Sequence, residues 1–139
     1  MATAGYSGTP LLRKLGVRDE HVVLLDRAPD GFDLGATGAH VVRRLPARPT
    51  LDVSLTFHTR LAALSARLPA LFGRTRTAGM VWVCWPKRTA QRAFGIGSDL
   101  DENLVRDLAL GLGWVDVKVA AIDETWSGLK LVRRLKLRR

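Results

Sequence analysis

The sequence predicts one α/β domain over residues 1–139, a three-layer, Rossmann-like domain with a mostly parallel sheet and an antiparallel C-terminal strand. Short apolar runs ended by turn residues recur along the chain, and such runs are typical of strands buried on both faces. Helical segments separate several of these runs, as they do in parallel sheets. The last two predicted strands are joined only by residues 123–127, which are too few for a parallel crossover, so that pair is antiparallel.

The first half of the chain supplies three predicted strands. Residues 1–16 are expected to form an extension ending in a short helix over 7–16, which Thr9 can cap and Gly16 can end. Residues 51–57 alternate between apolar and polar side chains, so the apolar ones are expected to lie on one face of the strand. The predicted strands of this half cover residues 21–26, 40–45 and 51–57, the last being the alternating one.

The second half adds two helices and three strands. A helix over 60–72 carries a stripe of leucines, and Pro69 is expected to kink or restart it. Residues 79–85 are the most apolar run and are expected at the centre of the sheet. Ser98 or Asp99 is expected to cap the next helix, whose inner face would carry Leu100, Leu104, Val105, Leu108 and Leu112. Strands over 114–122 and 128–137 follow, the second with Leu129, Leu131, Leu135 and Leu137 on one face.

The composition indicates a globular protein with one core, since 47% of the residues are hydrophobic and 25% are charged. The single cysteine, Cys84, provides neither a disulfide framework nor a zinc site. No signal-peptide pattern stands at the start, and no apolar run approaches the ~18 residues of a membrane-spanning helix. A cytoplasmic location is therefore expected.

The net charge of +9 is concentrated at the C-terminal end. Residues 130–139 hold six basic side chains and no acid, which leaves 16 basic and 13 acidic side chains elsewhere. This basic strand end could protect a sheet edge from aggregation, bind nucleic-acid phosphates without specificity, or contact an anionic membrane surface. No recognised nucleic-acid motif accompanies it. The six residues are Lys130, Arg133, Arg134, Lys136, Arg138 and Arg139.

The segments 51–57, 77–85 and 110–134 together resemble the class I S-adenosylmethionine-dependent methyltransferase fold, a parallel α/β sheet closed by an antiparallel final strand. A closer resemblance is to a bacterial family catalogued as domain of unknown function 3052. It is carried by "GYSGTPLLRKLG" (5–16), "APDGF" (28–32), "WPK" (85–87) and "DETWSGLK" (123–130). The second resemblance implies an actinobacterial-type cytoplasmic protein with no assigned activity.

The methyltransferase resemblance implies two cofactor-binding elements that this sequence lacks. A glycine-rich turn is expected after the first strand, but "DRAPDGFD" contains only Gly31. An acid is expected at the end of the second strand, but "VVRRLPARP" contains Arg43, Arg44 and Arg48. These arginines could hold a phosphate, or they could form a solvated strand end, because adjacent strand residues point to opposite faces.

Polar residues nevertheless follow several predicted strands, at the sheet edge where open α/β sheets bind ligands. The predicted cleft holds Asp26, His58, Trp85, Lys87, Asp123, Glu124, Trp126 and Ser127. His58 or Glu124 would transfer protons, and Lys87 would hold an anion. In the alternative, structural interpretation, Asp123 and Ser127 satisfy the N–H groups of a tight turn and Trp126 covers the core.

These observations favour a cytoplasmic, non-catalytic or small-ligand-binding domain derived from a methyltransferase-like fold. Two alternatives remain open. One is a divergent transferase that binds an anionic, nucleotide-like cofactor, and the other is a basic accessory protein on nucleic acid. The sequence identifies neither a cofactor nor a metal site.

Overall fold

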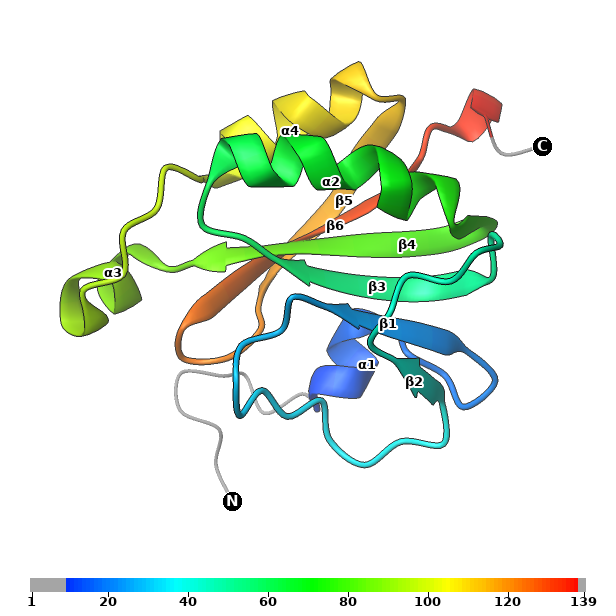
Figure 1. The fold of residues 1–139 in the computed structure, drawn as a ribbon, viewed down its shortest axis with the longest axis horizontal. Coiled ribbons are helices and arrows are strands. Elements are labelled where there is room, and N and C mark those ends of the chain that lie inside the picture. The colour runs from blue at the N-terminus through cyan, green and yellow to red at the C-terminus, as the bar shows by residue number, and fades with distance from the viewer. Residues whose placement is uncertain (1–9, 138–139) are drawn as a thin grey trace.

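The computed structural model describes residues 10–137, which form an α/β fold around one six-stranded mixed sheet (Figure 1). The strands are β1 (Val22–Asp26), β2 (His40–Val42), β3 (Leu51–Phe57), β4 (Thr75–Pro86), β5 (Trp114–Ala121) and β6 (Trp126–Arg133). The helices are α1 (Leu11–Leu15), α2 (Leu61–Gly73), α3 (Arg88–Phe94) and α4 (Glu102–Gly111), and a 3-10 turn follows over Leu135–Leu137.

The sheet order is β2-β1-β3-β4-β6-β5. The first four strands in that order run parallel, whereas β6 is antiparallel to both β4 and β5. The predicted antiparallel C-terminal strand is therefore confirmed, as is the central place of β4. The expectation that basic residues protect a final edge strand is wrong, because β6 is paired on both sides and the edge is β5.

Helices cover the two faces of the sheet unequally. Figure 1 shows α2 and α4 over one face, where they pack with leucine and valine side chains of the inner strands. The opposite face is covered by the five residues of α1 and by the segment 27–39, with Leu15, Leu34 and Trp82 in its core. Three full layers are thus not confirmed, because the second covering layer is one short helix and a loop.

Two predicted strands are shorter in the structure than the sequence indicated. β2 ends at Val42, where the chain bends ahead of Pro46, so the predicted strand to residue 45 is wrong. β6 ends at Arg133 and a 3-10 turn follows, so Leu135, which is 78% exposed, lies outside the predicted apolar face. The predicted cap at Thr9 lies outside the described residues.

The helices also depart from their predicted ends. Pro69 does not restart α2, which runs unbroken, because Pro69 and Ser65 both lie on the exposed side where water can reach the carbonyl left without a donor. The N-cap of α4 is Asp101, whose Oδ1 accepts from the Leu104 N–H at 2.9 Å. Helix α3 was not predicted at all.

The two residues predicted to cap α4 have other roles, and its predicted inner face is confirmed in part. Asp99 accepts from the backbone N–H of Leu61 at 2.7 Å and so caps α2, while Ser98 accepts from the N–H of Leu100. The inner face of the α4 region is made by Leu100, Val105 and Ala109, with Leu108 partly buried. Leu104 and Leu112 are exposed, which corrects the predicted face.

Candidate functional site

Four polar side chains meet on the α2 face, at the carboxyl ends of β1 and β3. Asp26 closes β1 and lies opposite Thr56 in the parallel register, and His58 directly follows β3. Because side chains alternate between faces, Asp26, Thr56 and His58 all point to the face that α2 covers. Arg67 reaches them from α2. These four residues are called the Asp26 network below.

The carboxylate of Asp26 is fully engaged by its neighbours. Arg67 donates to it through two nitrogens, with Nη2 to Oδ1 at 2.7 Å and Nε to Oδ2 at 3.1 Å. The Thr56 hydroxyl donates to Oδ2 at 2.7 Å. Burial by itself raises the pKa of Asp26, but the hydrogen bonds from Arg67 and Thr56 and the charges of Arg67 and Arg27 outweigh it and lower the pKa. Asp26 is therefore ionised and paired.

His58 extends this network by one hydrogen bond. Its Nε2 lies 2.6 Å from the Thr56 Oγ1. Since the single hydroxyl hydrogen of Thr56 goes to the ionised Asp26, the network assigns the ring hydrogen to Nε2, which donates to Thr56. Burial, with the charges of Arg27 and Arg67, lowers the pKa of His58 to about 4, although Asp26 opposes the shift. The imidazole is thus neutral at pH 7.

The backbone that leaves β1 takes a conformation usually reserved for glycine. Arg27 has a φ of 57°, and among the described residues it alone has a positive φ without being glycine. Such a conformation costs about 1–3 kcal/mol at a residue with a side chain. It stands where the methyltransferase resemblance implies a glycine-rich turn, directly after Asp26.

The turn between β5 and β6 is held by Asp123. Its Oδ1 accepts from the backbone N–H groups of Thr125 and Trp126, each at 2.8 Å, while the Trp126 carbonyl accepts from Ile122 and Asp123. A Cβ at Gly128 would come within 2.7 Å of the Ile122 side chain, so only glycine fits there without repacking. Asp123 therefore has the structural role that the alternative interpretation expected, and Gly128 has one as well.

The remaining predicted cleft residues divide between the two faces of the sheet. Trp85 is buried in the core beneath α2 and α4, and it lies opposite Ser127 in the β4–β6 ladder. On the other face Trp126 packs edge-on against Phe57, with ring centroids 5.2 Å apart. The structure thus joins Asp26 and His58 but separates them from Trp126.

Lys87 lies at the end of β4, beside the turn. Its backbone N–H donates to the Thr125 carbonyl at 2.8 Å. Burial and the charge of Lys14 lower the pKa of Lys87, and the charge of Glu124 opposes them. Glu124 itself is exposed. Lys87 and Glu124 therefore interact electrostatically beside the turn.

Replacing Asp123 by Ala is expected to lower the free energy of unfolding by about 1–3 kcal/mol, because two N–H groups lose a charged acceptor. Glu124→Ala is the matched control on the adjacent, exposed residue and should change stability by less than about 0.5 kcal/mol. Urea denaturation of both variants measures the difference. Equal stabilities for Asp123→Ala and the wild type would contradict the structural role of the turn.

Among the described residues, the basic C-terminal side chains are not all exposed. Arg133 donates to the backbone carbonyls of Phe72, Thr75 and Arg76, and its guanidinium lies 4.9 Å from the Trp114 ring centroid. Arg133 therefore ties β6 to the end of α2 and the start of β4. Of the other predicted phosphate-binding residues, Lys130 is half-buried in β6 and Arg138 and Arg139 lie outside the described residues.

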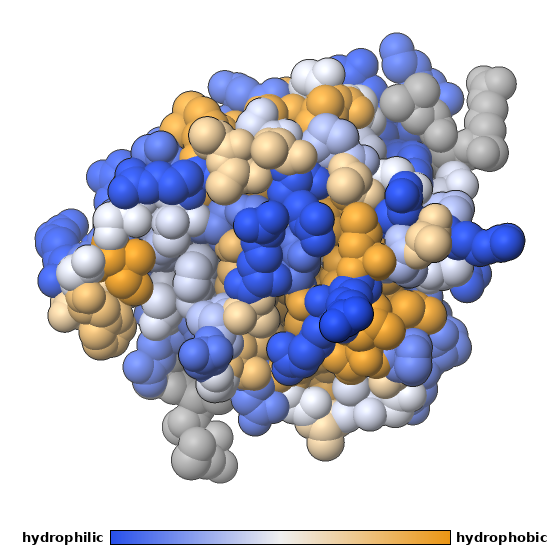
Figure 2. Space-filling model, viewed as in Figure 1, coloured by the Kyte–Doolittle hydropathy of each residue, from blue (hydrophilic) through white to orange (hydrophobic). Residues whose placement is uncertain are grey.

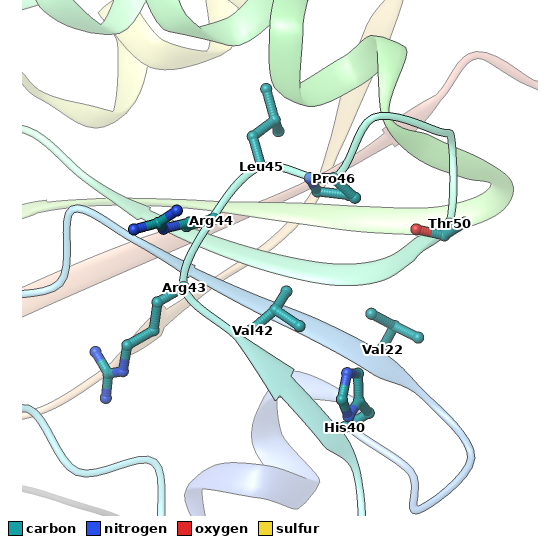
Figure 3. Close-up of a pocket in the computed structure, with 8 residues that line it drawn as sticks. All are labelled: Val22, His40, Val42, Arg43, Arg44, Leu45, Pro46 and Thr50. Carbon is teal, nitrogen blue, oxygen red and sulfur yellow. The ribbon is translucent and has the colours of Figure 1, made fainter.

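A hollow of about 560 Å³ opens beside β1 and β2 (Figure 3). Sequence reasoning separated Arg43 from Arg44 by strand alternation, but β2 ends before both of them, so that reasoning does not apply. Figure 3 shows their side chains extending to the same side of the segment. The residues that line this β2 hollow are Val22, His40, Val42, Arg43, Arg44, Leu45, Pro46 and Thr50.

Residues 10–137 contain neither a metal-binding cluster nor a membrane-spanning helix. Within that range no group of three or more His, Cys, Asp or Glu side chains is arranged to hold a metal ion. No helix in the same range has the length and apolar character needed to cross a membrane.

Comparisons with known proteins find matches among solved structures alone. No protein-family model and no curated protein matches the chain. A solved structure described as LepI in complex with SAM aligns with 89% of this chain and 39% of its own, with a TM-score of 0.49 and 12% sequence identity. The chain therefore spans about two fifths of that structure's length. Membership in the domain of unknown function 3052 family stays a prediction.

Proposed function

We propose that this chain is a degenerate methyltransferase-like domain that binds a small anionic ligand and does not transfer methyl groups. The observation that carries the proposal is the Asp26 network. At the carboxyl ends of β1 and β3, where open α/β sheets bind ligands, the chain's own Arg67 and Thr56 already satisfy the carboxylate.

The strand arrangement and the missing motifs support the same proposal. The antiparallel β6 beside a parallel sheet agrees with the methyltransferase resemblance. An adenosyl cofactor would need a carboxylate for its ribose and a glycine turn that lets the backbone approach. Here the chain after β2 carries arginines in place of that acid, and Arg27 occupies the strained position after β1. The carboxylate that does lie at this edge, Asp26, is already paired with Arg67.

A thermal-shift panel tests this proposal on the whole chain. S-adenosylmethionine and S-adenosylhomocysteine are expected to leave the melting temperature unchanged, whereas at least one phosphorylated or carboxylated metabolite should raise it. A ligand at 100 times its dissociation constant adds roughly 2.7 kcal/mol to the stability. Stabilisation by S-adenosylmethionine together with methyl transfer to any acceptor would contradict the proposal.

A divergent transferase with a nucleotide-like cofactor is the second candidate. Three arginines follow β2 where the methyltransferase resemblance implies an acid, and a phosphate group is the partner they would suit. The same panel therefore includes nucleotides and dinucleotides. A dinucleotide shift that disappears in the Arg43→Ala, Arg44→Ala double variant would favour this candidate.

A further inference from the structure

The β2 hollow exists because, within residues 10–137, no helix covers β2 and the start of β1 on the α2 face. The connection from β2 to β3 spans only residues 43–50 and contains Pro46 and Pro49, so it cannot form the crossover helix usual between parallel strands. Helix α2 lies over β4 instead. The connection itself becomes one wall of the hollow (Figure 3).

The floor of the hollow is apolar. Val22, Val42 and Leu45 are partly buried and pack against the core cluster beneath α2. Figure 2, in the view of Figure 1, shows hydrophobic atoms at the surface over β1 and β2, next to hydrophilic side chains. A volume of about 560 Å³ is within the range of small-molecule sites.

The rim of the hollow carries arginines that form no ion pair among the described residues. Between Asp33 and Asp52 the chain has no acid, while it carries Arg43, Arg44 and Arg48. No carboxylate among the described residues forms an ion pair with any of these arginines. The Asp52 carboxylate accepts from the backbone N–H of Val22 at 2.8 Å and lies 3.6 Å from the Nε of Arg76. Figure 3 shows the Arg43 and Arg44 side chains leaving adjacent positions of the segment and diverging, both on the side away from Val22 and Thr50.

We propose that the β2 hollow binds a small organic anion with an apolar body and one carboxylate or phosphate group. The apolar body lies on Val22, Val42 and Leu45, and the anionic group binds Arg43 and Arg44, whose guanidinium groups suit either oxyanion. This inference rests on the proposed ligand-binding function and names the class of ligand and its place.

Titrations of the ¹⁵N-labelled full chain with 2-naphthoate and 2-naphthyl phosphate test the inference. Saturable shifts are expected at the backbone amides of Val22, Val42, Leu45 and Thr50. The neutral 2-naphthamide should bind more weakly because it lacks the charge, and inorganic phosphate should bind more weakly because it lacks the apolar body. Adenosine monophosphate should bind more weakly than 2-naphthyl phosphate, since the floor offers its base no polar partners.

Variants test which residues contact the anionic group of the ligand and which contact its apolar body. Arg44→Ala is expected to raise the dissociation constant of 2-naphthoate about tenfold, the size of one lost charge-assisted contact. Arg48→Ala is the matched control, because it removes an equal charge from the same connection but from a residue that does not line the hollow. Val42→Phe, which fills the floor, should abolish the shifts from 2-naphthoate.

Several outcomes would overturn the inference. Equal binding of 2-naphthamide, equal effects of Arg44→Ala and Arg48→Ala, or tighter binding of adenosine monophosphate would each do so. Failure of both naphthyl anions to bind, while a metabolite of the thermal-shift panel binds elsewhere, would overturn the inference and leave the proposed function standing. Methyl transfer from S-adenosylmethionine would contradict the proposed function, whatever binds in the hollow.

Discussion

Arg67→Met is expected to lower the free energy of unfolding by about 3 kcal/mol, because it leaves a buried, ionised Asp26 without its cationic partner. Methionine keeps most of the apolar stem of the arginine, so the loss reports on the charge and its hydrogen bonds. The hydrogen bond from Thr56 alone cannot replace the bidentate contact of Arg67, whose nitrogens lie 2.7 and 3.1 Å from the Asp26 carboxylate oxygens.

Urea denaturation at pH 7 measures this loss. Arg92→Met on α3 is the matched control, since Arg92 is an exposed helical arginine without an ion pair among the described residues, and it should cost less than about 0.5 kcal/mol. Adding Asp26→Asn to Arg67→Met should cost less than the sum of the single changes, because the two residues interact directly. Additive effects, or a loss below about 0.5 kcal/mol for Arg67→Met, would contradict the network.

The stability of the chain is expected to rise by about 3 kcal/mol between pH 4 and pH 6.5 because of His58. An unfolded histidine binds a proton below about pH 6.5, whereas burial holds the pKa of folded His58 at about 4. Within this window the unfolded state binds more protons, so lowering the pH favours unfolding. Because the pKa of Asp26 is lowered, the stability that Asp26 contributes is lost only at pH values below the ordinary carboxyl range, which lie outside this window.

Urea denaturation at a series of pH values isolates the effect of His58. His58→Gln should lose most of the slope, since glutamine can still donate to Thr56 but does not titrate. His40→Gln is the matched control at an exposed histidine and should keep the slope. The same slope in the wild type and in His58→Gln would show that His58 is not held neutral by burial.

The fold could be predicted where local pattern determines it. Local residue patterns predicted the buried strands β1, β3 and β4. They also predicted the short connection between β5 and β6. The place of β6 between β4 and β5 was not predicted, because the order of strands in a sheet depends on contacts between distant segments. The extent of β2 was overstated, since the predicted strand included Arg43, Arg44 and Leu45, whereas the chain bends after Val42.

The candidate site could be predicted in part for the same reason. Asp26 and His58 were found because they follow strand ends, a position that sequence reveals. Arg67 and Thr56 were missed: Arg67 stands 41 residues from Asp26 on a helix, and Thr56 belongs to the polar half of an alternating strand. Thr56 could have been found by treating this strand as buried on both faces. A buried hydroxyl needs a buried hydrogen-bond partner, and that partner is Asp26.

The most direct test of the proposed function is a titration of the ¹⁵N-labelled chain with S-adenosylhomocysteine, observed at the amides of Asp26, Arg27 and His58. These amides are expected to stay unchanged, because the glycine-rich turn and the acid after the second strand are missing and Arg67 and Thr56 already engage Asp26. Saturable shifts at these three amides that disappear in Asp26→Asn would contradict the proposal. They would show that the Asp26 network opens to admit the cofactor.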